Sequence, residues 1–127
     1  MGTRSLTFVY DRDEPVVCMY NQYDGYPSGV GAELADILVG RTIVNGFGTG
    51  TPQKASNGMG CLAATIISEF KTGIGGCYLY PIGTGDAGQD YVYRIYNDRV
   101  VVEDYNGRQL FDGPWTQFSD WCKIDEE

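Results

Sequence analysis

Apolar and polar side chains alternate through residues 3–10, which places Leu6 and Phe8 on the same side of the chain. A spacing of two residues predicts a β-strand with one buried face. Residues 16–20 are apolar at every position, which is typical of a central strand. Because only the charged residues 11–15 separate the two segments, we expect them to pair as an antiparallel hairpin.

Intervals of three and four residues between apolar side chains predict helices in two later segments. The first begins near Val30, with Ser28 or Gly29 as its cap, and Gly40 ends it. The second spans residues 58–71 and has the most regular pattern in the chain. Its apolar face comprises Met59, Leu62, Ala63, Ile66, Ile67 and Phe70.

Further strands are expected in the second half of the chain, followed by a last helix. Residues 77–81 predict one strand, and residues 91–96 and 100–105 predict a hairpin that turns at Asn97 and Asp98. Pro114 suits the first position of a short final helix.

The order strand-strand-helix-helix-strand-strand-strand-helix predicts a single α+β domain over residues 1–127. We expect an antiparallel or mixed sheet with the helices packed mainly on one face. A chain of this length buries enough apolar surface to fold alone. The predicted core comprises Phe8, Val17, Met19, Leu62, Ile66, Phe70, Leu79, Val92 and Val101.

Acidic residues outnumber basic residues by 17 to 9, so the formal charge is −8 at pH 7. This balance argues against binding to a nucleic-acid backbone, which requires a basic surface. Residues 1–6 lack the apolar region of a secretory signal, and no segment is long enough to span a bilayer. We therefore expect a cytoplasmic protein that does not associate with membranes.

The four cysteines lie far apart, and the chain contains no histidine. This pattern gives no support for a zinc-finger type of metal site, and we expect neither a metal nor a cofactor. Disulfides are not expected in a reducing compartment. Cys18, Cys61 and Cys77 lie among apolar or small residues, which favours buried thiols that act as small hydrophobic groups.

Residues 20–31 hold three tyrosines, an amide pair, one carboxylate and three glycines. Such a segment, here called the tyrosine loop, offers ring faces that stack on a ligand and polar groups that hydrogen-bond its edge. The alternative is a pair of consecutive turns whose tyrosines cover the edge of the core. The candidate ligand-binding residues are Gln22, Tyr23, Asp24, Tyr26, Ser28, Gly29 and Gly31.

Two glycine-rich segments, residues 46–60 and 83–88, are further candidates for the lining of a shared pocket. Flexible connections are the simpler interpretation. The aromatic set at the carboxyl end comprises Phe111, Trp115, Phe118 and Trp121. It suits either a partner-binding stripe or a helix docked on the sheet, and we favour the docked helix.

Hydrolytic chemistry has weak support in the sequence. The lack of histidine removes the commonest general base. Asp24 and Asp86 are candidates for a paired acid and base, although aspartate beside glycine is also typical of ordinary turns. No residue is therefore assigned as catalytic.

Four segments resemble a family of small uncharacterised proteins of bacteriophages and bacteria. They are residues 1–7 (MGTRSLT), 22–29 (QYDGYPSG), 57–64 (NGMGCLAA) and 75–81 (GGCYLYP). The resemblance covers most of the chain. It implies the cytoplasm of a bacterial host cell as the setting, and it supplies no catalytic residues.

We expect a non-enzymatic protein that binds a small polar ligand or a host protein. The alternatives are a carboxylate-based hydrolase that uses Asp24, and a structural protein that assembles as a homo-oligomer. If the tyrosine loop binds the ligand, Arg4 or Arg41 is expected near Asp24 to balance its charge.

Overall fold

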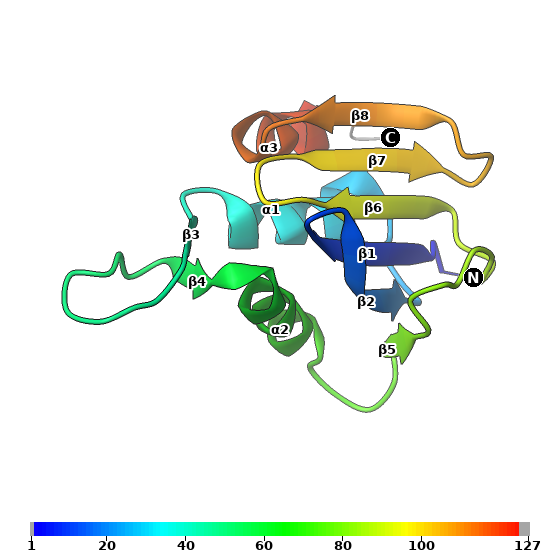
Figure 1. Cartoon of the computed structure of the whole chain (residues 1–127). Coiled ribbons are helices and arrows are strands. Elements are labelled where there is room, and N and C mark those ends of the chain that lie inside the picture. The colour runs from blue at the N-terminus through cyan, green and yellow to red at the C-terminus, as the bar shows by residue number, and fades with distance from the viewer. Residues whose placement is uncertain (1, 125–127) are drawn as a thin grey trace.

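The computed structural model describes residues 2–124 as a six-stranded sheet with a small two-stranded sheet beside it (Figure 1). The large sheet has the order β5-β2-β1-β6-β7-β8, and β1 and β6 are parallel while the other neighbours are antiparallel. The strands are β1 Ser5–Asp11, β2 Glu14–Asn21, β3 Thr42–Val44, β4 Ala55–Asn57, β5 Cys77–Tyr80, β6 Tyr91–Ile95, β7 Val100–Asp104 and β8 Gln109–Gly113. The helices are α1 Ala32–Leu38, α2 Gly58–Phe70 and α3 Trp115–Ile124, and a π-helical turn, η1, covers Pro27–Gly31.

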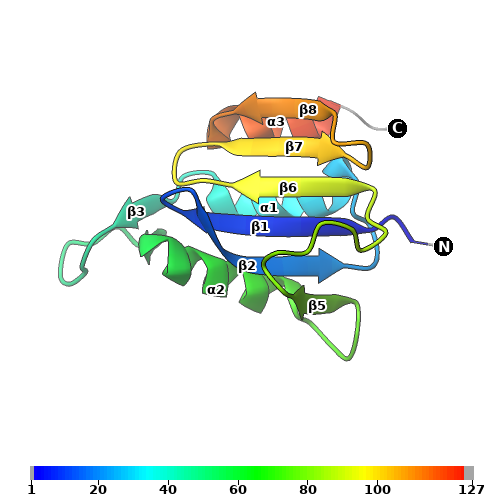
Figure 2. The same ribbon diagram turned by 45° about the vertical axis from the view of Figure 1, so that its right-hand side comes forward.

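All three helices lie behind the large sheet in the view of Figure 2. Val9 and Met19 of the sheet are fully buried there, together with Leu34, Leu62 and Phe118 of the helices. The predicted apolar face of α2 is confirmed, since Met59, Leu62, Ala63 and Ile66 are buried. The predicted class, an α+β domain with a mixed sheet and helices on one face, is confirmed.

The opposite face of the sheet carries its own smaller core without a helix. Leu6, Phe8, Cys18, Tyr20 and Val92 are buried there. The connection from β5 to β6 crosses in front of β1 and β2 (Figure 2), and Ala87 of this connection packs on the cluster. The chain therefore closes this face with a loop.

The hairpin of β1 and β2 is tighter than predicted. Only Arg12 and Asp13 form the turn, and both have positive φ angles, 54° and 70°. Two consecutive residues of this kind match the twist of a two-residue hairpin turn. The charged residues Asp11 and Glu14, predicted as turn, are therefore a cross-strand pair.

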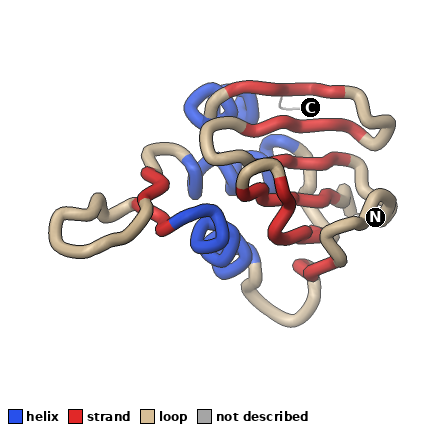
Figure 3. Tube along the Cα trace, viewed as in Figure 1, coloured by secondary structure: helices blue, strands red, loops and turns tan. Residues whose placement is uncertain are grey.

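The short extended segment that the sequence suggests at residues 42–44 is present as β3, whereas β4 and β8 do not follow from the apolar pattern. Strands β3 and β4 pair in parallel at the base of an arm, and residues 45–54 form the loop of this arm, away from the main sheet (Figure 3). Strand β8 has two adjacent apolar residues, Leu110 and Phe111, and its register with β7 shifts between Val102 and Glu103. The irregular register removes the alternation from which a strand is predicted.

Some predicted core positions are wrong. Leu79 is 61% exposed because β5 is the edge strand of the sheet. Cys61 is exposed because it lies outside the buried face of α2. Val17 and Phe70 are half-buried, whereas the remaining predicted core residues are buried.

Candidate functional site

The tyrosine loop leaves the end of β2 and is fastened to the start of β1. The Gly25 N–H donates to the Thr3 carbonyl at 2.9 Å, and the Tyr93 hydroxyl donates to the Gly25 carbonyl at 2.7 Å. A Cβ atom at Gly25 would lie 2.8 Å from the Arg4 carbonyl carbon and 2.9 Å from the Ser5 Cβ. Close packing therefore requires glycine at position 25, and this part of the loop has a structural role.

The side chains predicted to bind a ligand lie on the outer surface of the loop. Tyr23 is 57% exposed and Tyr26 is 40% exposed, and Asp24 and Ser28 are exposed too. The Tyr26 hydroxyl donates to Asp24 Oδ1 at 3.1 Å, and this bond raises the pKa of Tyr26. The pKa of Glu33 is also raised, mainly by the burial of its carboxyl group and secondly by the negative charge of Asp24.

The backbone donors of the loop are engaged internally. The N–H groups of Gly29 and Gly31 both point to the Tyr26 carbonyl, at 2.9 and 3.4 Å. The half-buried Gln22 donates its N–H to the Gly76 carbonyl at 2.9 Å, so the loop lies beside the glycine-rich end of the α2–β5 connection. These bonds occupy the donors that a bound anion would use.

Neither predicted arginine balances Asp24. Arg41 donates from Nε to the Ile37 carbonyl at 2.8 Å and from Nη1 to Ser56 Oγ at 3.1 Å, which ties the end of α1 to β4. Within residues 2–124 the ion pairs are those of Arg94 with Glu103 and of Arg99 with Asp112. The exposed position of Asp24 explains why it needs no cationic partner.

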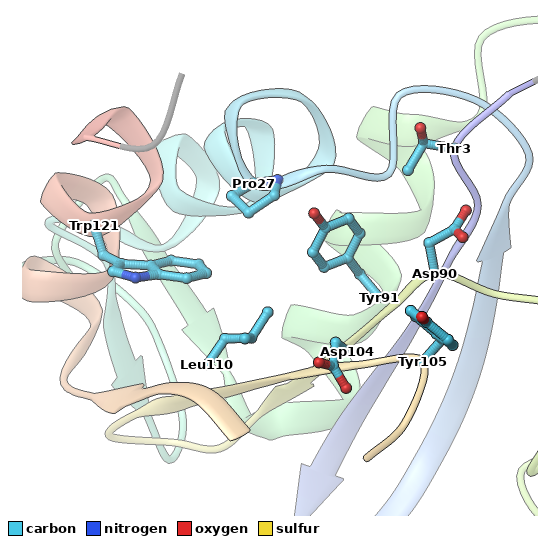
Figure 4. Close-up of a pocket in the computed structure, with 8 residues that line it drawn as sticks. All are labelled: Thr3, Pro27, Asp90, Tyr91, Asp104, Tyr105, Leu110 and Trp121. Carbon is cyan, nitrogen blue, oxygen red and sulfur yellow. The ribbon is translucent and has the colours of Figure 1, made fainter. Parts of the chain in front are cut away.

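A cleft of about 580 Å³ opens at the end of the sheet where β6 begins and β7 ends. Figure 4 shows Tyr91 in the middle of this end cleft, with Trp121 on one side and Asp90 and Tyr105 on the other. Its lining is completed by the loop residue Pro27 and three others. The full set is Thr3, Pro27, Asp90, Tyr91, Asp104, Tyr105, Leu110 and Trp121.

Both carboxylates of the end cleft are held by backbone N–H groups. Asp90 Oδ2 accepts from the Arg4 N–H at 3.0 Å. Asp104 Oδ1 accepts from the N–H groups of Asn106 and Arg108, each at 2.9 Å. These bonds fix the two carboxylates in place through one oxygen each, and the second oxygen of each has no hydrogen-bond partner among the described residues.

The aromatic lining comes from three separate elements. Trp121 of α3 stacks on Phe111 of β8, with ring centroids 5.2 Å apart. Tyr91 lies directly opposite Asp104 across the β6–β7 ladder. Tyr105 follows β7 and is 70% exposed. Tyr91 and Tyr105 therefore lie on the side of the carboxylates, and Trp121 faces them from the other side of the cleft (Figure 4).

A second hollow of about 500 Å³ shares Asp90 and Tyr105 with the end cleft. Gly85, Asp86 and Gly88 of the predicted glycine-rich segment 83–88 line it. The other predicted glycine-rich segment, residues 46–60, lines separate hollows with Thr51, Asn57 and others. Of the two glycine-rich segments that the sequence suggested as pocket lining, residues 83–88 lie beside the end cleft and residues 46–60 line other hollows.

Of the tyrosine loop, Pro27 is the residue that lines the end cleft, and the predicted set of seven does not contribute to it. Trp121 belongs to the aromatic set noted in the sequence, whose Trp115 and Phe118 are buried as expected for a docked helix. Asp90 and Asp104 carry no motif of their own. The turn signal Asn106-Gly107 after Asp104 is the one local feature that marks this part of the site.

No protein-family model matches the chain, and no curated protein or solved structure matches it either. None of the helices in the described range is long and apolar enough to cross a membrane. The same residues include no group of three or more acidic or cysteine side chains placed to hold a metal ion.

Proposed function

We propose that this protein binds a small polar ligand in the end cleft and does not transform it. The observation that carries the proposal is the pair of fixed carboxylates, Asp90 and Asp104, beside three aromatic rings in one hollow. A concave site with a few placed polar groups among apolar faces is the usual form of a small-molecule site.

The setting that we propose is the bacterial cytoplasm. All four cysteines are free thiols in the structure, which suits a reducing compartment. The resemblance to small phage and bacterial proteins, read from residues 1–7 and 22–29, agrees with this setting.

The alternative hydrolase would use Asp24, which lies on the exposed tyrosine loop and outside the lining of the end cleft. Asp86, its suggested partner, lines the second hollow with Asp90. The two proposals differ in product formation, since a binding protein returns its ligand unchanged.

The test is a thermal-shift screen against sugars, nucleotides and amines, followed by mass spectrometry of each bound compound. Two matched variants then locate the site. Tyr105→Ala removes a ring of the cleft that is 70% exposed, and Tyr23→Ala removes a ring of the tyrosine loop that is 57% exposed. Both changes leave the core intact, so the melting temperature of each free variant should stay close to that of the parent.

We expect Tyr105→Ala to weaken binding by about fivefold, since one stacking ring contributes on the order of 1 kcal/mol. Tyr23→Ala should leave binding unchanged. The opposite result, with loss in Tyr23→Ala alone, would move the site to the tyrosine loop. Release of a cleaved product would replace the binding proposal with the hydrolase.

A further inference from the structure

Among the residues that the structure describes, the lining of the end cleft includes two carboxylates and no lysine or arginine. Asp90 and Asp104 receive their hydrogen bonds from neutral backbone N–H groups, and neither takes part in the ion pairs found within residues 2–124. Within the described residues, neither carboxylate is therefore ion-paired with a basic side chain, and the lining of the cleft carries a net negative charge. A concave surface of one sign of charge concentrates ligands of the opposite sign.

Aromatic faces beside the carboxylates add to the same preference. The electron-rich faces of tryptophan and tyrosine attract ammonium groups, and the attraction grows as water is excluded. Tyr91, Tyr105 and Trp121 supply such rings around the cleft (Figure 4). Phosphate and carboxylate ligands are disfavoured, since they would meet Asp90 and Asp104 in a cleft whose described lining residues include no lysine or arginine.

The second hollow differs in charge from the first. It holds Asp86 and Asp90, but a Cβ atom at Gly88 would lie 3.2 Å from Arg4 Nη1, so a guanidinium is at its margin. The negative charge there is partly balanced, and Gln89 adds a neutral polar group. A ligand that extends from the end cleft into this hollow would place a neutral polar part in it.

We infer that the ligand of the end cleft carries an alkylammonium group, bound between Asp90, Asp104 and the rings of Tyr91, Tyr105 and Trp121, with a neutral polar remainder toward the second hollow. This inference rests on the proposed binding function. A free amine and a lysine side chain share this chemistry, and the experiment separates the two sources.

The test compares cations with neutral molecules of the same shape. Choline is paired with 3,3-dimethylbutan-1-ol, butylamine is paired with butan-1-ol, and a short lysine-containing peptide is added as a third arm. The chain has two tryptophans. Trp121 lines the cleft. Trp115 is not among the lining residues, and its indole N–H donates to the Tyr96 carbonyl at a distance of 3.0 Å. Their two indole N–H signals in a ¹⁵N spectrum give a site readout with an internal control.

Three charge variants complete the design. Asp90→Asn and Asp104→Asn remove a charge but keep an oxygen that accepts the existing backbone bonds. Asp98→Asn makes the same change in net charge at the exposed turn between β6 and β7. It is the matched control, because it lies outside the lining of the cleft.

We expect each cation to shift the Trp121 signal at concentrations about tenfold lower than its neutral counterpart needs. Asp90→Asn and Asp104→Asn should each reduce this preference by about threefold, and added salt should weaken it. Asp98→Asn should retain it, and the Trp115 signal should stay in place. A stronger response to the peptide than to butylamine would identify lysine side chains as the source.

The inference and the function on which it rests fail in different ways. If neutral sugars or alcohols shift the Trp121 signal as strongly as the cations, the cleft is a binding site but the ammonium preference is wrong. If no compound of any class shifts that signal at tens of millimolar, both proposals are overturned. An equal loss of preference in Asp98→Asn would show that only the net charge of the protein matters.

Discussion

Replacement of Tyr93 by phenylalanine tests how the tyrosine loop is held against the sheet. Tyr93 is fully buried, and its hydroxyl donates to the carbonyl of the buried Gly25 at 2.7 Å. Phenylalanine keeps the ring packing and leaves that carbonyl without its donor. A buried acceptor that loses its partner costs about 1–3 kcal/mol, which corresponds to a fall in melting temperature of roughly 4–12 °C for a domain of this size.

The pH dependence of this loss gives a second measurement. Burial raises the pKa of Tyr93 well above its usual value of 10.0. The unfolded tyrosine ionises near pH 10 and the folded one does so later, so the parent loses stability as the pH rises above about 10. Tyr93→Phe has no phenol to ionise, and the difference between the two proteins should shrink by up to about 1.4 kcal/mol per pH unit.

Urea unfolding of the parent and of Tyr93→Phe at pH 8 and pH 11 measures both effects. Tyr105→Phe is the matched control, since its ring is 70% exposed and loss of its hydroxyl should change stability by less than about 0.5 kcal/mol. A loss below about 0.5 kcal/mol for Tyr93→Phe at pH 8 would refute the role of the hydrogen bond. An unchanged difference at pH 11 would refute the account of the buried phenol.

Two further predictions concern the cysteines and the glycines. Burial raises the pKa of Cys18 to about 11 and of Cys122 to about 12. Native protein at pH 8 should therefore react with a thiol reagent mainly at the exposed Cys61. Mass spectrometry after labelling should show all four cysteines modified only in denaturant. Gly29→Ala should destabilise the fold, because the new Cβ would lie 2.2 Å from the Asp24 carbonyl oxygen, whereas Gly60→Ala has open space in α2 and should stabilise it by about 0.5–1 kcal/mol in chemical denaturation. Equal labelling of Cys18 and Cys61, or a stable Gly29→Ala, would contradict the packing described for these positions.

Local patterns in the sequence predict most of the elements correctly. The helix over residues 58–71 follows from the regular spacing of Met59 to Phe70, and the structure begins and ends it within one residue of that range. The hairpin about Asn97 and Asp98 follows from two apolar segments with a short turn between them. Both patterns arise from neighbours close in the chain, which is why a sequence alone reveals them.

The end cleft could not be read from the same patterns. Asp90 immediately precedes β6, Asp104 is the last residue of β7, and Trp121 comes from α3, which follows β8 in the chain. The composition of the tyrosine loop suggested a binding site. In the structure, contacts such as the hydrogen bond from Tyr93 to the Gly25 carbonyl hold the loop against the sheet. Composition shows which groups are present but not which of them face a common hollow.

The sequence by itself determined the α+β class, the single domain, the apolar face of α2 and the lack of a histidine-based site, because each depends on residue types and short-range spacing. Only the tertiary structure decided that β1 pairs in parallel with β6, since that pairing joins segments more than 80 residues apart. The parallel pairing brings Asp90 next to Arg4, whose backbone N–H donates to Asp90 Oδ2 at 3.0 Å, and the end cleft lies beside this contact. Contacts over such distances depend on the packing of the whole core, and no local stretch of the chain encodes them.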